Sequence, residues 1–203
     1  MFDLYLRMIQ QKVFTPIASL LARLFTPNQI TLIAFVFGLL SSYYLFYSHN
    51  FLGILLFALN RIFDGLDGTV ARLTNKQSDF GGYLDIVTDF IVYSLIPISL
   101  TLSNPSIYAL TLLSIMMSTF FVNAASLFQL SALLEKRNLG SKANKEKTSV
   151  CMPPALIEGF ETYCVYFTFM AFPQYKESIF IFFSICVSIN VIQRLRWAYM
   201  NLV

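Results

Sequence analysis

The chain has 203 residues, of which 57% are hydrophobic and only 12% are charged, and its mean hydropathy is +0.65. Soluble domains carry about 25% charged residues, so this composition indicates an integral membrane protein. The net charge of +3, without a basic and aromatic-rich stretch, argues against nucleic acid as a partner. The three cysteines lack CxxC spacing and a nearby histidine, which argues against a thiolate metal centre or a disulfide framework.

The first 27 residues are predicted to form an N-terminal amphipathic juxtamembrane helix. Residues 2–25 intersperse large apolar side chains with three cations, Arg7, Lys12 and Arg23. This pattern is typical of a helix that lies along the membrane surface rather than across it. Pro16 is expected to break this helix in two or to begin its second half.

Six apolar segments follow, each long enough to cross a membrane. They cover residues 29–48, 51–72, 81–102, 106–134, 153–173 and 177–199. The first is introduced by "TPNQIT", where Asn28 is expected to cap the helix, and Asp79 is expected to cap the third. The longest hydrophilic loop covers 135–149. We therefore predict an all-α membrane protein with one domain over 1–203, in which residues 28–199 form a bundle of six transmembrane helices.

The distribution of basic residues predicts how the chain is oriented. With a cytoplasmic N-terminus, all of the 14 Lys and Arg residues fall on the cytoplasmic side except Arg61, inside the second segment, and Lys176. This bias predicts that both termini, and the loop between the second and third segments, are cytoplasmic. The expected location is the inner membrane of a bacterium.

Four aspartates lie inside the second and third segments, namely Asp64, Asp67, Asp85 and Asp89. Thirteen residues precede Asp64 in its segment and thirteen follow Asp89, which corresponds to about 20 Å of helix in each case. Asp64 and Asp89 should therefore lie at the same depth. The spacings i,i+3 and i,i+4 place each pair on one helix face, so the four could converge.

Four like charges at membrane depth are unfavourable unless a positive charge lies among them. Carboxylates from two helices suit hard cations such as Mg²⁺ or Mn²⁺, and four could bridge two ions, as in sites of phosphoryl displacement. A simpler alternative is that the aspartates face a water-filled vestibule or cap helices. Gly65, Gly68 and Ala71 allow close helix packing or room for a ligand, and Arg72 could bind a phosphate.

The motif Asp64-x-x-Asp67-Gly68-x-x-Ala71-Arg72, then eight residues, then Gly81-x-x-x-Asp85-x-x-x-Asp89, resembles the complete signature of the CDP-alcohol phosphatidyltransferases. The six-segment layout and "TPNQIT" extend this resemblance to most of the chain. The resemblance implies that Asp64, Asp67 and Asp85 bind metal, and that Asp89 contacts a second ion and acts as the general base. It also implies contacts to the CDP group, made by Gly68 and Arg72 with Ala71 beside them, and by Ser78, Asn28 and Thr31.

The reaction implied by the resemblance transfers a phosphatidyl group from a CDP-linked lipid, CDP-diacylglycerol, to an alcohol, with release of CMP. The family also implies a homodimer. The sequence disfavours two alternatives. A divalent-cation transporter would need a polar path to the outer face, which the apolar segments 51–60 and 90–100 do not offer. A non-catalytic relative is disfavoured because all four aspartates are present.

The sequence does not identify the acceptor alcohol. A phosphorylated acceptor would need cations, and several lie on the expected cytoplasmic side, namely Lys136, Arg137, Lys142, Lys145, Arg194 and Arg196. Orientation alone also predicts a basic cytoplasmic loop. Glu158 and Glu161 could bind a polyol or an amine, or could pair with Arg61, and the structural role is favoured because a buried charge needs a partner.

Overall fold

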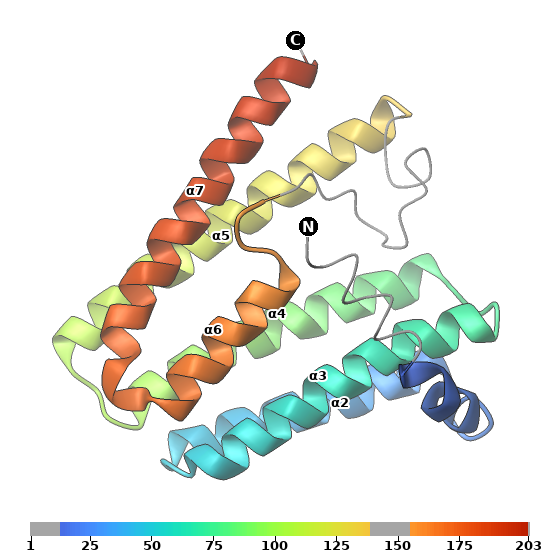
Figure 1. Cartoon of the computed structure of the whole chain (residues 1–203), viewed down its shortest axis with the longest axis horizontal. Helices are drawn as coiled ribbons and strands as arrows, with labels where there is room; N and C mark the ends of the chain where they lie inside the picture. The colour runs from blue at the N-terminus through green and yellow to red at the C-terminus, as the bar shows by residue number, and fades with distance from the viewer. Residues whose placement is uncertain (1–12, 139–154, 203) are drawn as a thin grey trace. The chain divides into compact units, whose positions relative to one another are not determined.

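The computed structural model describes residues 13–138 and 155–202, and the chain is helical with no strand within these residues (Figure 1). The helices are α2 (Pro27–Phe46), α3 (Asn50–Leu73), α4 (Asp79–Leu102), α5 (Ile107–Lys136), α6 (Gly159–Ala171), the 3₁₀ turn η1 (Pro173–Tyr175) and α7 (Lys176–Leu202). A further helical stretch covers residues 13–21, and Pro16 lies inside it. The rest of the predicted juxtamembrane helix, residues 1–12, lies outside the described residues.

Five of the six predicted segments correspond to α2, α3, α4, α5 and α7 within three residues at each end. The prediction for the fifth segment was wrong at its start. Residues 153–154 lie outside the described part, 155–158 are not helical, and α6 has only 13 residues. The Asn190 side chain explains this difference, because its Oδ1 accepts hydrogen bonds from Leu156 N at 2.9 Å and Ile157 N at 3.0 Å. These backbone groups therefore have partners without a helical turn.

Both predicted helix caps were wrong by one or two residues. The N-cap of α2 is Thr26, whose backbone N–H donates to Gln29 Oε1 at 2.8 Å. Pro27 can begin the helix because its fixed φ suits the first position and its missing N–H needs no partner there. The cap of α4 is Ser78, whose Oγ accepts from Gly81 N at 3.0 Å. Asp79 is the first residue inside α4, where the helix dipole favours a negative charge.

Four described helical segments are long and apolar enough to cross a membrane: Pro27–Phe46, Asp79–Leu102, Ile107–Lys136 and Pro173–Leu202. The other two predicted segments, now α3 and α6, do not meet these criteria, one because of its charge and the other because of its length. Helix α3 has sufficient length, with 24 residues, but carries four charged side chains, Arg61, Asp64, Asp67 and Arg72. Helix α6 is apolar but spans only about 20 Å at 1.5 Å per residue.

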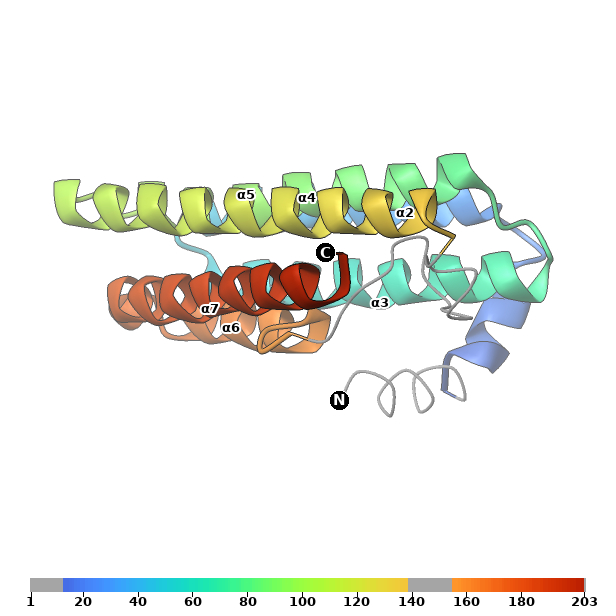
Figure 2. The same ribbon diagram turned by 90° about the horizontal axis from the view of Figure 1, so that it is seen from above.

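The chain divides into two compact units. The first comprises Met1–Ser106 with Tyr166–Pro173, and in it α2 packs against both α3 and α4 (Figure 1). The second comprises Ile107–Val165 with Gln174–Val203, and in it α5 packs against α7 (Figure 2). Helix α6 begins in the second unit and ends in the first. All of the predicted site residues belong to the first unit.

Close packing in the first unit depends on a small residue in α2. A side chain at Gly38 would overlap Val92 of α4 and approach the Asn60 amide of α3. The Asn60 Nδ2 donates to the backbone carbonyl of Ala34 at 2.8 Å and ties α3 to α2. Because glycine lets helices approach closely, α2 serves as a platform for the hairpin of α3 and α4 that carries the aspartates.

Candidate metal and nucleotide site

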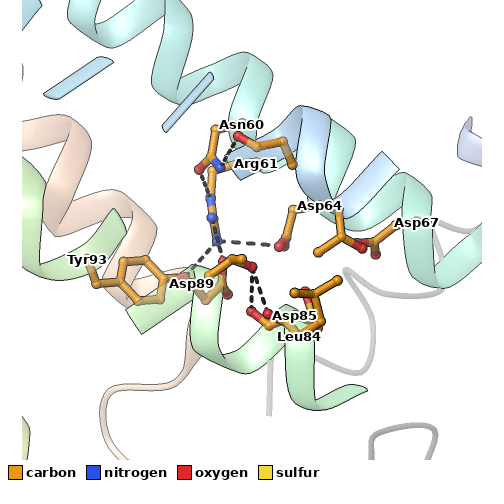
Figure 3. A network of polar contacts seen from close by, with 11 residues as sticks. Asn60, Arg61, Asp64, Asp67, Leu84, Asp85, Asp89 and Tyr93 are labelled. Carbon is orange, nitrogen blue, oxygen red and sulfur yellow. Dashed lines mark hydrogen bonds and ion pairs between the residues drawn. The ribbon is translucent and has the colours of Figure 1, made fainter. Parts of the chain in front are cut away.

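Three of the four aspartates converge between α3 and α4 (Figure 3). Asp64, Asp85 and Asp89 each offer one carboxylate oxygen, and these oxygens lie within 4.8 Å of one another. All three residues are partly buried, and Asp85 Oδ1 is buried without a hydrogen-bond partner among the described residues. Hard oxygen donors from two helices, one of them unsatisfied, fit a divalent cation such as Mg²⁺ or Mn²⁺.

Asp67 lies one helical turn further along α3 and is held differently. Its Oδ2 accepts a hydrogen bond of 2.5 Å from Thr31 Oγ1 of α2. Both residues are buried, with exposed fractions of 6% for Asp67 and 4% for Thr31. The structure thus brings three of the four aspartates into one group and places Asp67 beside it. It also directs the Thr31 hydroxyl, predicted to contact the nucleotide, toward a carboxylate.

Arg61 places a positive charge in direct contact with the acidic group. Its Nη2 donates to Asp89 Oδ1 at 2.6 Å, and its Nη1 lies 3.6 Å from Asp64 Oδ2 (Figure 3). The residue is 9% exposed, and its guanidinium carbon lies 5.5 Å from the Phe57 ring centroid and 5.1 Å from that of Tyr93. The Arg61 guanidinium is therefore in contact both with carboxylates of the acidic group and with two aromatic rings.

Two neutral side chains complete the contacts of Arg61. Its Nε donates to Asn60 Oδ1 at 2.7 Å, and its Nη1 donates to the Tyr93 hydroxyl at 2.8 Å. Sequence reasoning gave no role to Asn60 or Tyr93. Two signals were available: Tyr93 follows Asp89 by four residues, hence on the same face of α4, and Asn60 is polar within an apolar run.

Gly68 and Arg72 lie together on α3, one turn apart. A Cβ atom at Gly68 would come within 3.2 Å of Arg72 Nη1, so glycine leaves space for the guanidinium. Arg72 Nη2 donates to Thr69 Oγ1 at 3.2 Å. Ala71, the preceding residue, is half-buried. Gly68, Ala71 and Arg72 of the predicted signature therefore lie within five consecutive residues of α3.

Asn28 and Ser78 meet at the first turn of α4. A Cβ atom at Gly81 would lie 3.1 Å from both Asn28 Oδ1 and Ser78 Oγ. Two residues predicted to contact the nucleotide, 50 positions apart, are therefore neighbours. The absence of a side chain at Gly81 leaves room for both polar atoms, and the Ser78 hydroxyl also caps α4.

Glu158, Glu161 and Arg194 belong to the second unit. Glu161 Oε2 accepts from Glu158 N at 3.0 Å, and Glu158 Oε1 accepts from Ala155 N at 3.3 Å, so both carboxylates serve the start of α6. Arg194 Nη1 donates to the Asn123 side chain at 2.6 Å and to its carbonyl at 3.1 Å. Lys142 and Lys145 lie outside the described residues.

Comparisons with known proteins agree with the motif. The profile of the family described as CDP-alcohol phosphatidyltransferase matches residues 24–190. The chain is 30% identical over 162 residues to the inner membrane protein YnjF of Escherichia coli, covering 79% of this chain and 77% of that protein. It is 44% identical over 64 residues to the archaetidylinositol phosphate synthase of Pyrococcus horikoshii, which is 32% of this chain and 34% of that protein.

The fold also matches solved structures of the phosphatidylinositol phosphate synthase of Mycobacterium tuberculosis. With CDP-DAG bound, that protein has a TM-score of 0.63 at 21% identity, over 91% of this chain and 92% of that one. In complex with manganese and citrate, the values are 0.65 and 22%, over 92% and 88%. A family match across most of the sequence, a relative of similar length and a shared fold lead to one conclusion: this integral membrane protein belongs to the CDP-alcohol phosphatidyltransferase family, the transferases of phospholipid biosynthesis.

Proposed function

We propose that the protein transfers a phosphatidyl group from CDP-diacylglycerol to a small alcohol and releases CMP. The observation that carries this proposal is the convergence of Asp64, Asp85 and Asp89 from two helices. The space that Gly68 leaves for Arg72 lies on the same helix as Asp64. A diphosphate held by metal needs carboxylates for the metal and a nearby cation for its own charge. This chain offers both within one signature.

In this proposal the four aspartates have two different roles, metal binding and general-base catalysis. Asp64, Asp67 and Asp85 would bind metal, and Asp89 would contact the second of two Mg²⁺ or Mn²⁺ ions and act as general base. When bound, the ions would stabilise charge on the entering and leaving oxygens. The acceptor oxygen bonds to the phosphorus that carries the lipid, its proton goes to Asp89, and the bond from that phosphorus to CMP breaks. The Asp89 side chain is 22% exposed, so a water-soluble alcohol can reach it.

The remaining predicted residues bind the nucleotide end of the donor. Arg72 compensates the diphosphate charge, and Gly68 with Ala71 allows the donor to approach α3. Asn28 and Ser78, which meet beside Gly81, offer an amide and a hydroxyl that can contact the cytidine or its ribose. Thr31 acts on the site through Asp67, the carboxylate to which it donates.

The proposal includes the setting of the reaction. We place the six predicted segments across a bacterial inner membrane as one domain, with both termini and the four aspartates on the cytoplasmic side, because basic residues gather there. Water-soluble alcohols and membrane-anchored donors meet at that face. The enzyme is proposed to be a homodimer, and a monomeric mass by light scattering in a mild detergent would contradict this.

The test is a transfer assay on purified protein with CDP-diacylglycerol, Mg²⁺ or Mn²⁺, and a panel of alcohols that includes glycerol 3-phosphate, inositol phosphate and serine. CMP release that requires one alcohol, and that is lost in Asp89→Asn, is the expected result. Asp79→Asn is the matched control, because it makes the same chemical change at an exposed position on the same helix. Wild-type protein that binds Mn²⁺ but releases no CMP with any alcohol would refute the proposal.

A further inference from the structure

The Arg61 guanidinium is fixed in position by contacts on each of its three nitrogens. Nε donates to Asn60, Nη1 donates to Tyr93, and Nη2 donates to Asp89. A guanidinium carries its five N–H donors in one rigid plane, so contacts in three directions define its orientation completely. Arg61 is therefore engaged by the protein itself, in contrast to a cation that waits for a substrate phosphate.

The partners of Arg61 are anchored in turn. The orientation of the Asn60 amide is determined by its two contacts, because Nδ2 donates to the Ala34 carbonyl while Oδ1 accepts from Arg61. Tyr93 is held from the other side by Tyr166, whose hydroxyl donates to the Tyr93 carbonyl at 2.6 Å. The two tyrosine rings also contact each other, with 5.3 Å between their centroids.

These contacts form a rigid support that ends at one carboxylate oxygen. From the α2 backbone through Asn60 to Arg61, and from Tyr166 through Tyr93 to Arg61, every link is a hydrogen bond or a ring contact between buried groups. A side chain that is packed and hydrogen-bonded on all sides keeps its partner within a fraction of an ångström of one geometry. That partner is Asp89, the base of the proposed reaction.

We propose that Arg61 is a positioning residue for Asp89. It holds Oδ1 in the 2.6 Å ion pair and leaves the second carboxylate oxygen to accept the proton of the alcohol. The fixed positive charge also offsets repulsion among the aspartates. This inference rests on the proposed function, because it assigns Arg61 a task only if Asp89 is the base.

A purely structural role for Arg61 makes different predictions. If Arg61 only held the acidic cluster together, its loss would destabilise the fold and disorder the site, so that turnover and Mn²⁺ binding would fall together. If Arg61 positions Asp89, the base is misaligned while the other aspartates, Asp64, Asp67 and Asp85, stay in place. A displacement of about 1 Å can cost about 100-fold in rate without loss of binding.

The experiment compares Arg61→Met, Arg61→Lys and Tyr93→Phe with wild type and with Arg23→Met, which removes an exposed cation elsewhere. Methionine keeps an unbranched apolar stem, lysine keeps the charge without the planar fork, and phenylalanine keeps the ring but loses one contact to Arg61. For each, kcat and KM are measured by CMP release, Mn²⁺ affinity by electron paramagnetic resonance without donor lipid, and the unfolding temperature in detergent.

In Arg61→Met, kcat should fall about 100-fold while KM for the CDP-lipid changes by less than about threefold. Its Mn²⁺ affinity should be kept or increased, since a neighbouring positive charge is removed. Arg61→Lys should recover part of the turnover, and Tyr93→Phe should show a smaller fall of about threefold to tenfold. Arg23→Met should match wild type.

Unchanged kcat in Arg61→Met, or loss of Mn²⁺ binding in parallel with activity, would overturn the inference. If Arg61→Met does not fold, Tyr93→Phe decides, because wild-type turnover in that variant would overturn it equally. A different result would refute the proposed function itself, namely wild-type protein that releases no CMP. An active wild type with an equally active Arg61→Met enzyme refutes only the role of Arg61.

Discussion

Both compact units bury an arginine, and the two differ in what surrounds the charge. In the first unit, Arg61 is 9% exposed and forms ion pairs with Asp89 and Asp64. In the second unit, Arg194 is 6% exposed and donates through Nη1 to the amide and carbonyl of Asn123, while its Nε has no hydrogen-bond partner among the described residues. One arginine meets several carboxylates, and the other joins α7 to α5.

The difference shows when a buried arginine indicates a metal or catalytic site and when it indicates only helix packing. A single arginine that binds a neutral amide across two helices needs no more explanation than helix packing, because that contact gives its Nη1 two acceptors and ties the helices together. An arginine inside a group of carboxylates that exceed it in charge leaves a negative site that a cation can fill. We therefore expect changes among the aspartates that surround Arg61 to alter metal binding and turnover first, and changes around Arg194 to alter stability first.

The largest effect is expected from Asp85→Asn in the first unit. Asp85 has a buried oxygen without a partner, and an amide in its place is a weaker ligand for a hard cation. Mn²⁺ affinity and CMP release should both fall by more than the roughly 10- to 100-fold typical of lost outer contacts to a metal site. Electron paramagnetic resonance and the transfer assay measure this, with Asp79→Asn as the control. Full Mn²⁺ affinity in Asp85→Asn would contradict a metal site here.

Thr31→Val tests whether the Thr31 hydroxyl serves Asp67 or the nucleotide. Valine keeps the shape but cannot donate to Asp67 Oδ2. If the hydroxyl orients Asp67, Mn²⁺ affinity should fall about 10-fold to 100-fold. If it contacts the nucleotide instead, KM for the CDP-lipid should rise while Mn²⁺ binding stays unchanged. Thr101→Val is the control, because Thr101 bonds only to the Pro97 carbonyl of its own helix among its described contacts.

Asn123→Ala probes the second unit. It leaves the buried Arg194 without its amide partner and is expected to lower the free energy of unfolding by about 1–3 kcal/mol. Thermal unfolding followed by size-exclusion chromatography measures the change, with Mn²⁺ affinity of the folded fraction at the wild-type value. Asn201→Ala removes an exposed amide on the same helix as Arg194 and should have little effect. A loss of Mn²⁺ binding in Asn123→Ala would contradict the expectation that changes in the second unit affect stability and not the metal site.

The smallest effects are expected from the same Gly→Ala change in each unit. Alanine favours a helix over glycine by about 0.8–1 kcal/mol, so Gly68→Ala should not destabilise α3. Its Cβ would, however, press on Arg72 Nη1 at 3.2 Å, and KM for the CDP-lipid should rise about threefold to tenfold. Gly159→Ala meets open space at the start of α6 and should leave KM unchanged. An equal KM for Gly68→Ala and wild type would contradict a role of Arg72 in binding the donor lipid.

The positions of five helices and the grouping of the aspartates were predictable for a simple reason. Apolar length and the spacing of residues along one helix are local properties. Counting residues along each helix is enough to place Asp64 of α3 and Asp89 of α4 at the same level of the hairpin. The ends of the helices were predicted less well. Thr26, Ser78 and the start of α6 at Gly159 depend on hydrogen bonds to particular neighbours, which composition does not reveal.

By itself, then, the sequence determined the class of protein, the helices that carry the site, and the signature of four aspartates with Gly68 and Arg72. Only the tertiary structure decided that Arg61 binds Asp89, that Thr31 donates to Asp67, and that Asp67 stands beside the other three. The physical reason is that contacts between helices depend on how each helix is rotated and how closely it is packed. Those quantities are set by residues such as Gly38 and Asn60, through contacts with distant parts of the chain.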